Sequence, residues 1–416
     1  MADHSGKDHR EAGSKRGRLL PELFPTAEAA GRTGILTAIC GCHLLHDGLA
    51  DTLYVFLPIW QKDFALSYAE IGMVVTLYFG ALAAFQLPAA LLAERVGERR
   101  LLVVGTTVVG LGFLVLGWVD GFAGLLAVLF LAGLGSTVQH PLGAALVARA
   151  YADEDRRVAI GTYNFSGDLG KALFPTMAGL ALLSVGWTVV TLGLGLVAVS
   201  MAAMFFVASS KWRIETLEIR PGTSVERQGE QTDNPRGFAV LSSIGMIDSF
   251  TRYGLLTLLP FLLISRGYTA SSAGMALGLL FAGGAAGKFL CGFLAQRIGV
   301  LATVWLTEIM TSGGIIALLL VPPGTLVVLL PLVGAALNGT STVLYGSVAD
   351  FVSPQRRTRA FGVFYTIVIA AGAVAPPAFG AVSDHTSVES SLTVVALVAL
   401  ATLPLASLLK RCESAG

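Results

Sequence analysis

Hydrophobic and polar positions alternate along this chain in long blocks. The sequence contains twelve mostly apolar runs separated by polar segments, and each run reaches about 20 residues, the length that an α-helix needs to cross a bilayer. Glycines and prolines inside these runs count less against a helix than in water, because neighbouring helices satisfy the freed backbone groups. The pattern therefore predicts transmembrane helices over residues 33–58, 68–92, 100–118, 122–149, 158–183, 187–209, 238–264, 271–295, 301–321, 325–349, 359–382 and 388–408.

The second half of this pattern repeats the first half. Seven positions recur at an offset of 201 to 202 residues, namely Asp47 and Asp248, Pro58 and Pro260, Gly72 and Gly274, Gly97 and Gly299, Gly161 and Gly362, Pro175 and Pro376, and Gly179 and Gly380. Internal repeats of this kind are typical of membrane transporters. The repeat predicts an all-α membrane protein of 12 transmembrane helices in two pseudo-symmetric six-helix bundles.

Composition supports a membrane protein. Hydrophobic residues make up 54% of the chain and charged residues 13%, with a mean hydropathy of +0.72, whereas a soluble domain is about 25% charged. The net charge of +1 says little about partners, and no basic surface interleaved with aromatic residues suggests nucleic acid. The expected partners are the lipid bilayer, a small-molecule substrate and protons.

Lysines and arginines predict the orientation in the membrane. If both termini are cytoplasmic, 23 of the 28 basic residues fall in cytoplasmic segments, while the outside loops hold Lys62 and Arg266. The other three, Lys171, Arg252 and Lys288, lie inside predicted helices. The positive-inside rule therefore places both termini in the cytoplasm.

Polar segments divide the chain into five parts. The expected organisation is a disordered cytoplasmic tail at 1–32, a six-helix bundle at 33–209, a cytoplasmic linker at 210–237, a second six-helix bundle at 238–409 and a cytoplasmic tail at 410–416. The first segment has no apolar core like that of a cleaved signal peptide.

The loop after the second predicted helix carries a recognisable motif. The major facilitator superfamily has a G-x-x-x-D-R-x-G-R-R-like motif at this place, and this chain has Ala90, Glu94, Arg95, Gly97, Arg99 and Arg100. Together with the two six-helix halves, these residues resemble that superfamily. The resemblance implies the major facilitator fold and a conformational latch, in which an acid and nearby arginines stabilise one of two transport states. The alternative is an ordinary positive-inside turn.

The fifth predicted helix resembles the antiporter motif of the same superfamily. That motif has the form g-x8-G-x3-G-P-x2-G-G, and the matching residues are Gly161, Gly170, Pro175 and Gly179. Small residues permit close helix packing, and proline weakens the helix where it bends. The resemblance implies export rather than import, while Phe174 and Ala178 depart from the motif.

The first half is similar to the fosmidomycin-resistance exporters within this superfamily. Those proteins carry an H-F-x-N-D-like stretch in the first helix and an H-P pair in the fourth, and this chain has His43 to Asp47 and His140-Pro141. The resemblance implies a multi-pass protein of the bacterial cytoplasmic membrane. The architecture needs no partner subunit, so we expect a monomer.

Ionisable residues inside apolar helices are the candidates for the chemistry, because a membrane otherwise excludes them. The first helix carries four such residues spaced along one stripe, and we expect proton coupling from His43, His46, Asp47 and Asp51. Imidazoles titrate near neutral pH. The alternative is a satisfied polar network that holds the first helix against its neighbours.

A second set is expected to bind the substrate. Its members are Gln86, Gln139, His140, Asn164, Asp168, Lys171, Asp248, Arg252 and Lys288. Pairing within one helix, Asp168 with Lys171 and Asp248 with Arg252, is the alternative for two of these groups. Glu308 is equally compatible with packing and is not included. Asp51 and Arg252 occupy equivalent positions in the two halves and are expected to act together.

Enzyme chemistry is not expected. The H-x-x-x-D-G pattern at His43 and the H-x-x-x-x-D pattern at His46 resemble acyltransferase motifs, but both lie in one apolar helix where this spacing brings the two side chains to one face. Cys40, Cys42, Cys291 and Cys412 have the spacing of neither a disulfide framework nor a zinc site. No cofactor and no metal site are expected.

The combined prediction is a secondary transporter, specifically a proton-coupled exporter of a small organic compound that works by alternating access. One alternative is a proton-coupled importer of an organic anion, with Lys171, Arg252 and Lys288 as the clamp. A second alternative is a membrane sensor or partner-binding protein that does not transport.

Overall fold

The computed structural model describes residues 27–151, 153–211, 233–353 and 356–413. All the regular elements among these residues are helices, as the apolar runs predict. They are α1 (Ala27–Asp63), α2 (Tyr68–Val96), α3 (Glu98–Leu116), α4 (Phe122–Ser136), α5 (Gln139–Ala150), α6 (Asp153–Ala181), α7 (Trp187–Lys211), α8 (Pro235–Ser265), α9 (Ala270–Ile298), α10 (Val300–Leu320), η2 (Pro323–Thr325), α11 (Leu326–Ser347), η3 (Val348–Asp350), α12 (Arg357–His385), α13 (Val388–Leu400) and α14 (Thr402–Glu413).

Ten stretches of these helices are long and apolar enough to cross a membrane, counting α4 with α5, η2 with α11 and η3, and α13 with α14 as single spans. The two remaining predicted spans, 33–58 and 158–183, lie on α1 and α6. These two helices carry most of the intramembrane ionisable residues. The all-α, 12-helix prediction agrees with this architecture.

Two predicted spans are interrupted. The fourth is divided between α4 and α5 at Thr137 and Val138, where the Thr137 hydroxyl donates to Leu134 O at 2.8 Å. Pro141 follows in the first turn of α5, a position where its missing N–H leaves no hydrogen bond unmade. The last span is divided at Ala401, with Pro404 in the first turn of α14.

Element ends differ from the predicted segment boundaries. α1 begins at Ala27, so residues 27–32 of the expected tail are helical. α7 ends at Lys211 and α8 begins at Pro235. The rest of the expected tail, residues 1–26, and the linker residues 212–232 lie outside the described residues.

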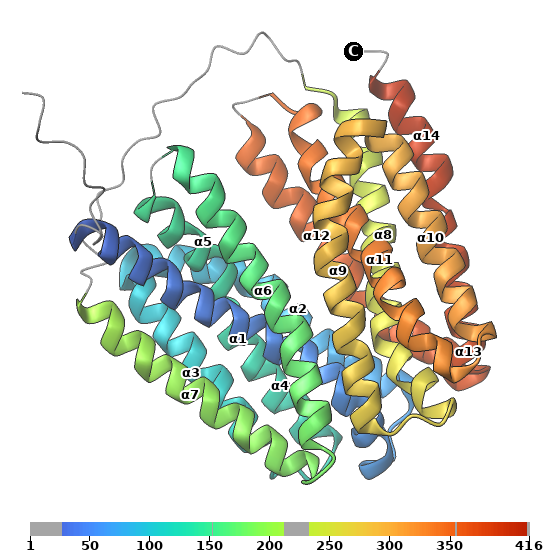
Figure 1. Ribbon diagram of the computed structural model, residues 1–416, viewed down its shortest axis with the longest axis horizontal. Coiled ribbons are helices and arrows are strands. Elements are labelled where there is room, and N and C mark those ends of the chain that lie inside the picture. The colour runs from blue at the N-terminus through green and yellow to red at the C-terminus, as the bar shows by residue number, and fades with distance from the viewer. Residues whose placement is uncertain (1–26, 152, 212–232, 354–355, 414–416) are drawn as a thin grey trace, which may run out of the picture.

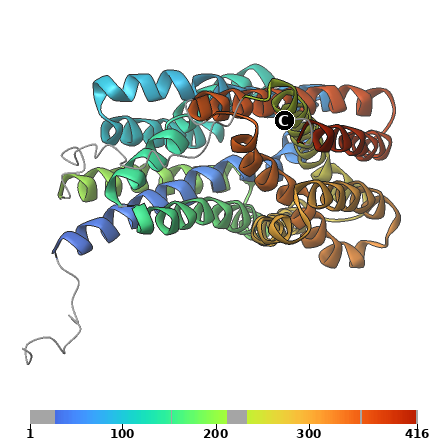
Figure 2. The same cartoon turned by 90° about the horizontal axis from the view of Figure 1, so that it is seen from above.

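The helices gather into two bundles, with α1–α7 on one side and α8–α14 on the other (Figure 1). Seen from above, the blue-to-green and the yellow-to-red helices occupy opposite sides of the molecule (Figure 2). The bundles approach each other at the end that contains the turn between α1 and α2. They diverge toward the end that carries the C-terminus (Figure 1).

Several of the repeated glycines and prolines lie where the two bundles touch. A Cβ atom on Gly72 of α2 would meet the backbone of Pro376 on α12, and a Cβ atom on Gly274 of α9 would meet Pro175 O on α6. Only glycine permits such close approach of two helix backbones. The sequence repeat therefore appears in the fold as two equivalent crossings, α2 with α12 and α6 with α9.

One of these crossings carries an additional polar link. Asp384, near the end of α12, accepts hydrogen bonds from the backbone N–H groups of Tyr68 at 2.7 Å and Ala69 at 3.0 Å. Its carboxylate thus caps the N-terminus of α2, where the helix dipole favours negative charge. A helix of one bundle is capped by a side chain of the other bundle.

Candidate functional site

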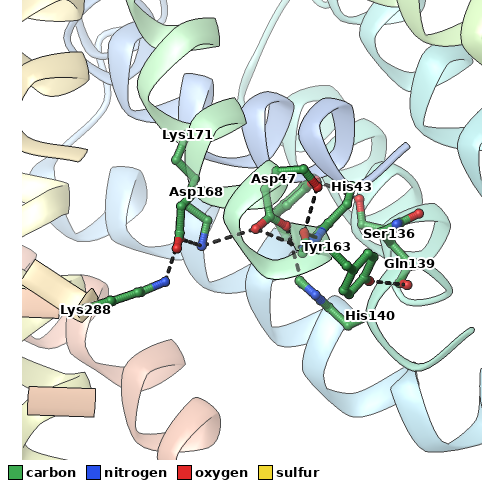
Figure 3. A network of polar contacts seen from close by, with 11 residues as sticks. His43, Asp47, Ser136, Gln139, His140, Tyr163, Asp168, Lys171 and Lys288 are labelled. Atoms are coloured by element: carbon green, nitrogen blue, oxygen red, sulfur yellow. Dashed lines mark hydrogen bonds and ion pairs between the residues drawn. The ribbon is translucent and has the colours of Figure 1, made fainter. Parts of the chain in front are cut away.

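The middle of the molecule holds ionisable side chains that converge from α1, α5 and α6 (Figure 3). His43 and Asp47 lie one turn apart on α1, with His43 Nε2 3.4 Å from Asp47 Oδ2. His140, in the first turn of α5, places its Nε2 3.5 Å from Asp47 Oδ1, and Lys171 Nζ of α6 lies 3.2 Å from Asp47 Oδ2. Three basic groups therefore surround one carboxylate.

The proton on His43 can be assigned from its neighbours. Its Nδ1 lies 2.7 Å from the carbonyl oxygen of Tyr163, and a carbonyl can only accept, so Nδ1–H is the donor. The imidazole also stacks on the Tyr163 ring at a centroid distance of 4.1 Å. When His43 is neutral, its Nε2 lone pair consequently faces the Asp47 carboxylate. A proton bound between these two acceptors converts repulsion into a charge-assisted hydrogen bond.

Asp168 connects this group of residues to the second bundle. Its Oδ1 lies 3.9 Å from Lys171 Nζ, and the same oxygen accepts a hydrogen bond of 2.5 Å from Lys288 Nζ on α9 (Figure 3). The Asp168–Lys288 pair is thus an ion pair between the two bundles. Lys171 and Lys288 are each 31% exposed at the side chain, so the pair lies next to solvent.

Counting charges shows that the group holds one acid in excess. Asp51 is buried one turn beyond Asp47 and lies within electrostatic reach of Lys171 and Lys288. With both histidines neutral, the carboxylates of Asp47, Asp51 and Asp168 face only the two ammonium groups of Lys171 and Lys288. A net buried charge is unfavourable in a membrane protein, and one bound proton removes it. We call these residues the central cluster: His43, Asp47, Asp51, His140, Asp168, Lys171 and Lys288.

Gly167 is a member of the site that sequence reasoning missed. A Cβ atom at this position would lie 2.7 Å from both Asp47 Oδ2 and His43 Nε2. Any larger residue would therefore occupy the space in which the imidazole and the carboxylate meet. The sequence signal is a glycine one residue before Asp168, which alone is weak because glycine is common in membrane helices.

The structure separates His46 from the predicted proton-coupling stripe. His46 Nε2 lies 2.9 Å from the Thr106 hydroxyl of α3, and that hydroxyl donates its own proton to Leu102 O. His46 is therefore the donor to Thr106 and acts as a neutral link between α1 and α3. At 100° per residue, His46 lies about 140° around the helix from Asp51, which explains why the two do not face the same space.

The three predicted amide ligands occupy different environments. Gln86 of α2 hydrogen-bonds to Tyr365 of α12, across the two bundles. Asn164 is exposed on α6, one turn before Asp168. Gln139 is 1% exposed, and its side chain lies against Tyr163 of α6. Gln86 and Asn164 are thus at least partly accessible, whereas Gln139 is enclosed by protein. Substrate binding by these residues remains a prediction.

Asp248 and Arg252 form their own pair on α8 instead of joining the central cluster. Arg252 Nη2 lies 3.3 Å from Asp248 Oδ2. This is the within-helix pairing that was the alternative for these residues, and it occupies Arg252 with Asp248 rather than with Asp51. Glu308 of α10, which the sequence left undecided, hydrogen-bonds to Asp248.

The residues of the predicted latch make contacts within their own bundle. Gly97, with φ of 92°, forms the turn between α2 and α3. Arg99 donates to Ser209 Oγ at 2.7 Å and to Phe206 O at 3.1 Å, which ties α3 to the end of α7. Glu94, Arg95 and Arg100 are exposed, and the acid that forms an ion pair beside the motif is Glu98, with Arg149. The latch role remains a prediction.

The residues of the antiporter-type motif lie in different environments. Gly170 packs against the backbone of Leu44 on α1, while Gly179 packs against Ser271 and Gly274 of α9. Pro175 lies at the same α6–α9 crossing. Gly161 has open space around it. Three of the four residues therefore permit close helix contacts, two of them between the bundles.

His43, Asp47 and His140 also have a spacing that suits a metal ion, since one donor atom from each lies within 4.8 Å of the others. Two imidazoles and a carboxylate are ordinary zinc ligands. The Lys171 ammonium, however, lies on the same carboxylate and repels a divalent cation. The geometry therefore favours a proton at this position, and the absence of a metal site remains a prediction.

Similar proteins support the architecture and place the chain among transporters. The fosmidomycin resistance protein of Escherichia coli (strain K12) is 25% identical over 407 residues, which cover 90% of this chain and 92% of that protein. The uncharacterized MFS-type transporter YfnC of Bacillus subtilis (strain 168) is 25% identical over 383 residues, covering 88% and 90% of the two chains. These matches confirm the predicted likeness to fosmidomycin-resistance-type proteins.

The fold also agrees with a solved structure. A bacterial homologue of the human lysosomal transporter Spinster, in an inward-facing and occupied conformation, superposes with a TM-score of 0.77 at 18% identity, covering 91% of this chain and 97% of that one. The family model described as Major Facilitator Superfamily matches residues 39–239 and 241–415. The chain is therefore a multi-pass membrane transporter that belongs to the Major Facilitator Superfamily.

Proposed function

We propose that this transporter is a proton-coupled exporter of a small organic compound, of the drug–proton antiporter type. The observation that carries the proposal is the lone pair of His43 Nε2 facing the Asp47 carboxylate in a cluster with one acid in excess. Such a site binds one proton when empty of substrate. A substrate that brings positive charge or displaces the Lys171 contact competes with that proton, and competition at one site is what antiport requires.

The positions of the bundles support alternating access. The predicted topology puts the turn between α1 and α2 outside the cell and both termini in the cytoplasm, in the inner membrane of a bacterium. The bundles meet at that turn and diverge at the opposite end (Figure 1). In this topology the described state faces inward. Substrate then enters from the cytoplasm as the proton leaves, and a proton from outside enters after the transporter has switched.

Relatives agree with export. One similar protein is named for fosmidomycin resistance, and three of the antiporter-motif residues lie at helix contacts in this chain. The importer alternative needs free cations to clamp an anion. Here Lys171 pairs with Asp47, Lys288 with Asp168 and Arg252 with Asp248, so each cation already has a carboxylate.

Transport into everted membrane vesicles tests this proposal. The full-length protein is expressed in vesicles whose lumen is acidified, and uptake of labelled fosmidomycin is measured first, followed by a panel of organic cations and anions. We expect one or more compounds to accumulate in the lumen and to be released when a protonophore collapses the gradient. Accumulation that is indifferent to the gradient, or transport of the accumulated compound only in the opposite direction, would contradict the proposal.

A further inference from the structure

Two buried carboxyl groups lie beside each other in the second bundle, away from the central cluster. Asp248 of α8 is 3% exposed and Glu308 of α10 is 1% exposed. Their side chains hydrogen-bond to one another. Two ionised carboxylates offer only acceptors, so this hydrogen bond requires a proton on one of them.

The hydroxyl groups beside Glu308 direct their protons to other acceptors. Thr307 donates its hydroxyl proton to Thr303 O at 2.9 Å, and Thr340 donates its own to Thr307 Oγ1 at 2.7 Å. Thr340 is therefore left with lone pairs for its contact with Glu308. In addition, Glu308 Oε2 is buried without a donor from the described residues. An ionised Glu308 carboxylate would therefore be poorly supplied with donors in this buried place.

The charge balance leads to the same conclusion. Arg252 pairs with Asp248 at 3.3 Å and supplies one positive charge, against two carboxyl groups. Lys288 on α9 also lies within electrostatic reach of Arg252, but its own partner is Asp168, and α11 contributes the Thr340 hydroxyl. Leaving one negative charge buried and unpaired is strongly unfavourable.

We infer that Asp248 and Glu308 form a second proton-binding site, in which one proton is shared between the carboxyls and Arg252 balances the remaining charge. The Arg252 side chain is 19% exposed while that of Asp248 is 4% exposed, so Arg252 lies between the pair and solvent. The proton leaves only when Arg252 moves aside. The site holds a proton regardless of which compound is transported and in which direction.

Infrared spectroscopy on the purified full-length protein in detergent tests this inference without a transport assay. At neutral pH we expect a carbonyl stretching band of a protonated carboxylic acid that is lost in Glu308→Gln. Glu389→Gln, the same change at the start of α13 in the same bundle, should retain the band. Persistence of the full band in Glu308→Gln would overturn the inference.

Thermal stability across pH gives an independent readout. Folding takes up a proton at this site, so the melting temperature should fall as the pH rises, and Glu308→Gln should reduce that fall by the share of this site, leaving the share of the central cluster. The glutamine amide can donate a hydrogen bond as the protonated acid does. Asp248→Asn serves as a second variant, since a single Glu308 carboxylate then pairs with Arg252 and also loses the acid band. Stabilisation by sodium at constant pH, in place of the pH dependence, would identify the bound ion as sodium and overturn the inference.

Discussion

Asp47 and Asp248 occupy equivalent positions in the two repeats but have different partners. Asp47 faces the imidazoles of His43 and His140, one of them a turn earlier on the same helix, whereas Asp248 pairs with the guanidinium of Arg252 a turn later. Imidazole changes its charge near neutral pH, while a guanidinium does not. The repeat therefore kept the carboxylate in both halves but gave imidazole partners only to the first one.

The two clusters share a charge balance and differ in access. Each holds one more carboxyl than it has permanently charged cations, and so each accommodates one proton. The central cluster includes a link between the bundles, from Lys288 to Asp168, and side chains that reach solvent. The Asp248–Glu308 pair is enclosed within one bundle. A proton in the central cluster can be exchanged during transport, whereas a proton on the Asp248–Glu308 pair is retained.

The largest expected effect distinguishes the two aspartates. Asp47→Asn removes the excess acid and the acceptor that His43 Nε2 faces, so the cluster no longer needs the proton. Losing a hydrogen bond to a charged group costs up to about 3 kcal/mol, which is roughly 100-fold. We therefore expect gradient-driven accumulation to fall by up to that factor. Asp248→Asn should reduce it much less, because Glu308 takes over Arg252. Equal losses in the two variants, measured in the same vesicles, would remove the distinction between the clusters.

At the two crossings between the bundles the repeat keeps the same close contact of a glycine with a helix backbone, so equivalent substitutions at the two glycines should have the same effect. Gly72→Ala and Gly274→Ala each place a methyl group against a helix of the other bundle, and such overpacking costs about 1–3 kcal/mol. Spin-label distances across the end where the bundles meet should show a shift toward separation in both variants. Gly80→Ala on α2 is the matched control, since its Cβ has open space. A shift in only one of the pair would show that the crossings are not equivalent.

The ion pair between the bundles should stabilise the described state. Lys288→Met leaves Asp168 with the more distant Lys171, and losing a hydrogen bond to a charged group costs about 1.5–3 kcal/mol. The fraction of molecules in which the two bundles are separated near the Asp168–Lys288 pair should rise. Spin-label distances between the bundles measure this fraction. Lys288→Arg keeps the charge and should restore most of the effect. An unchanged distribution in Lys288→Met would mean that the pair does not bias the two states.

The smallest predicted effect concerns the polar cap on the α2–α12 crossing. Asp384→Ala removes the acceptor of the Tyr68 and Ala69 N–H groups, a loss of about 1 kcal/mol. Ser67→Ala removes the local cap of the same helix, whose Oγ accepts from Glu70 N at 3.2 Å, without touching the other bundle. Both variants should melt earlier. Spin-label distances between the bundles should shift toward separation in Asp384→Ala and stay unchanged in Ser67→Ala. A similar shift in Ser67→Ala would mean that the loss of a cap on α2, and not the link between the bundles, changes the distances.

Much of the fold could be predicted from the sequence. Twelve apolar runs and a repeat of glycines and prolines suffice for the architecture, since each helix must satisfy its own backbone in lipid. The central cluster was largely predictable too, because ionisable residues in apolar helices are few. The helix breaks at Thr137 and Ala401 were not, since both lie within continuous apolar runs.

The pairing of the charges could not be obtained from the sequence. Spacing along α1 put His46 in the stripe, but its ring turns to a threonine of α3 that is 60 residues away. Glu308 was left undecided because its partner, Asp248, is on another helix. Contacts between helices depend on the rotation of each helix about its own axis, and this rotation cannot be predicted from a single sequence.

Proton release on substrate binding tests the central claim most directly. Purified protein in a weakly buffered solution with a pH indicator is mixed with a compound that the vesicle assay has identified. The wild type should release a proton, Asp47→Asn should release none, and Asp248→Asn should still release one. Equal release from Asp47→Asn and the wild type would contradict the assignment of the proton to the central cluster, and proton uptake by the wild type would contradict antiport.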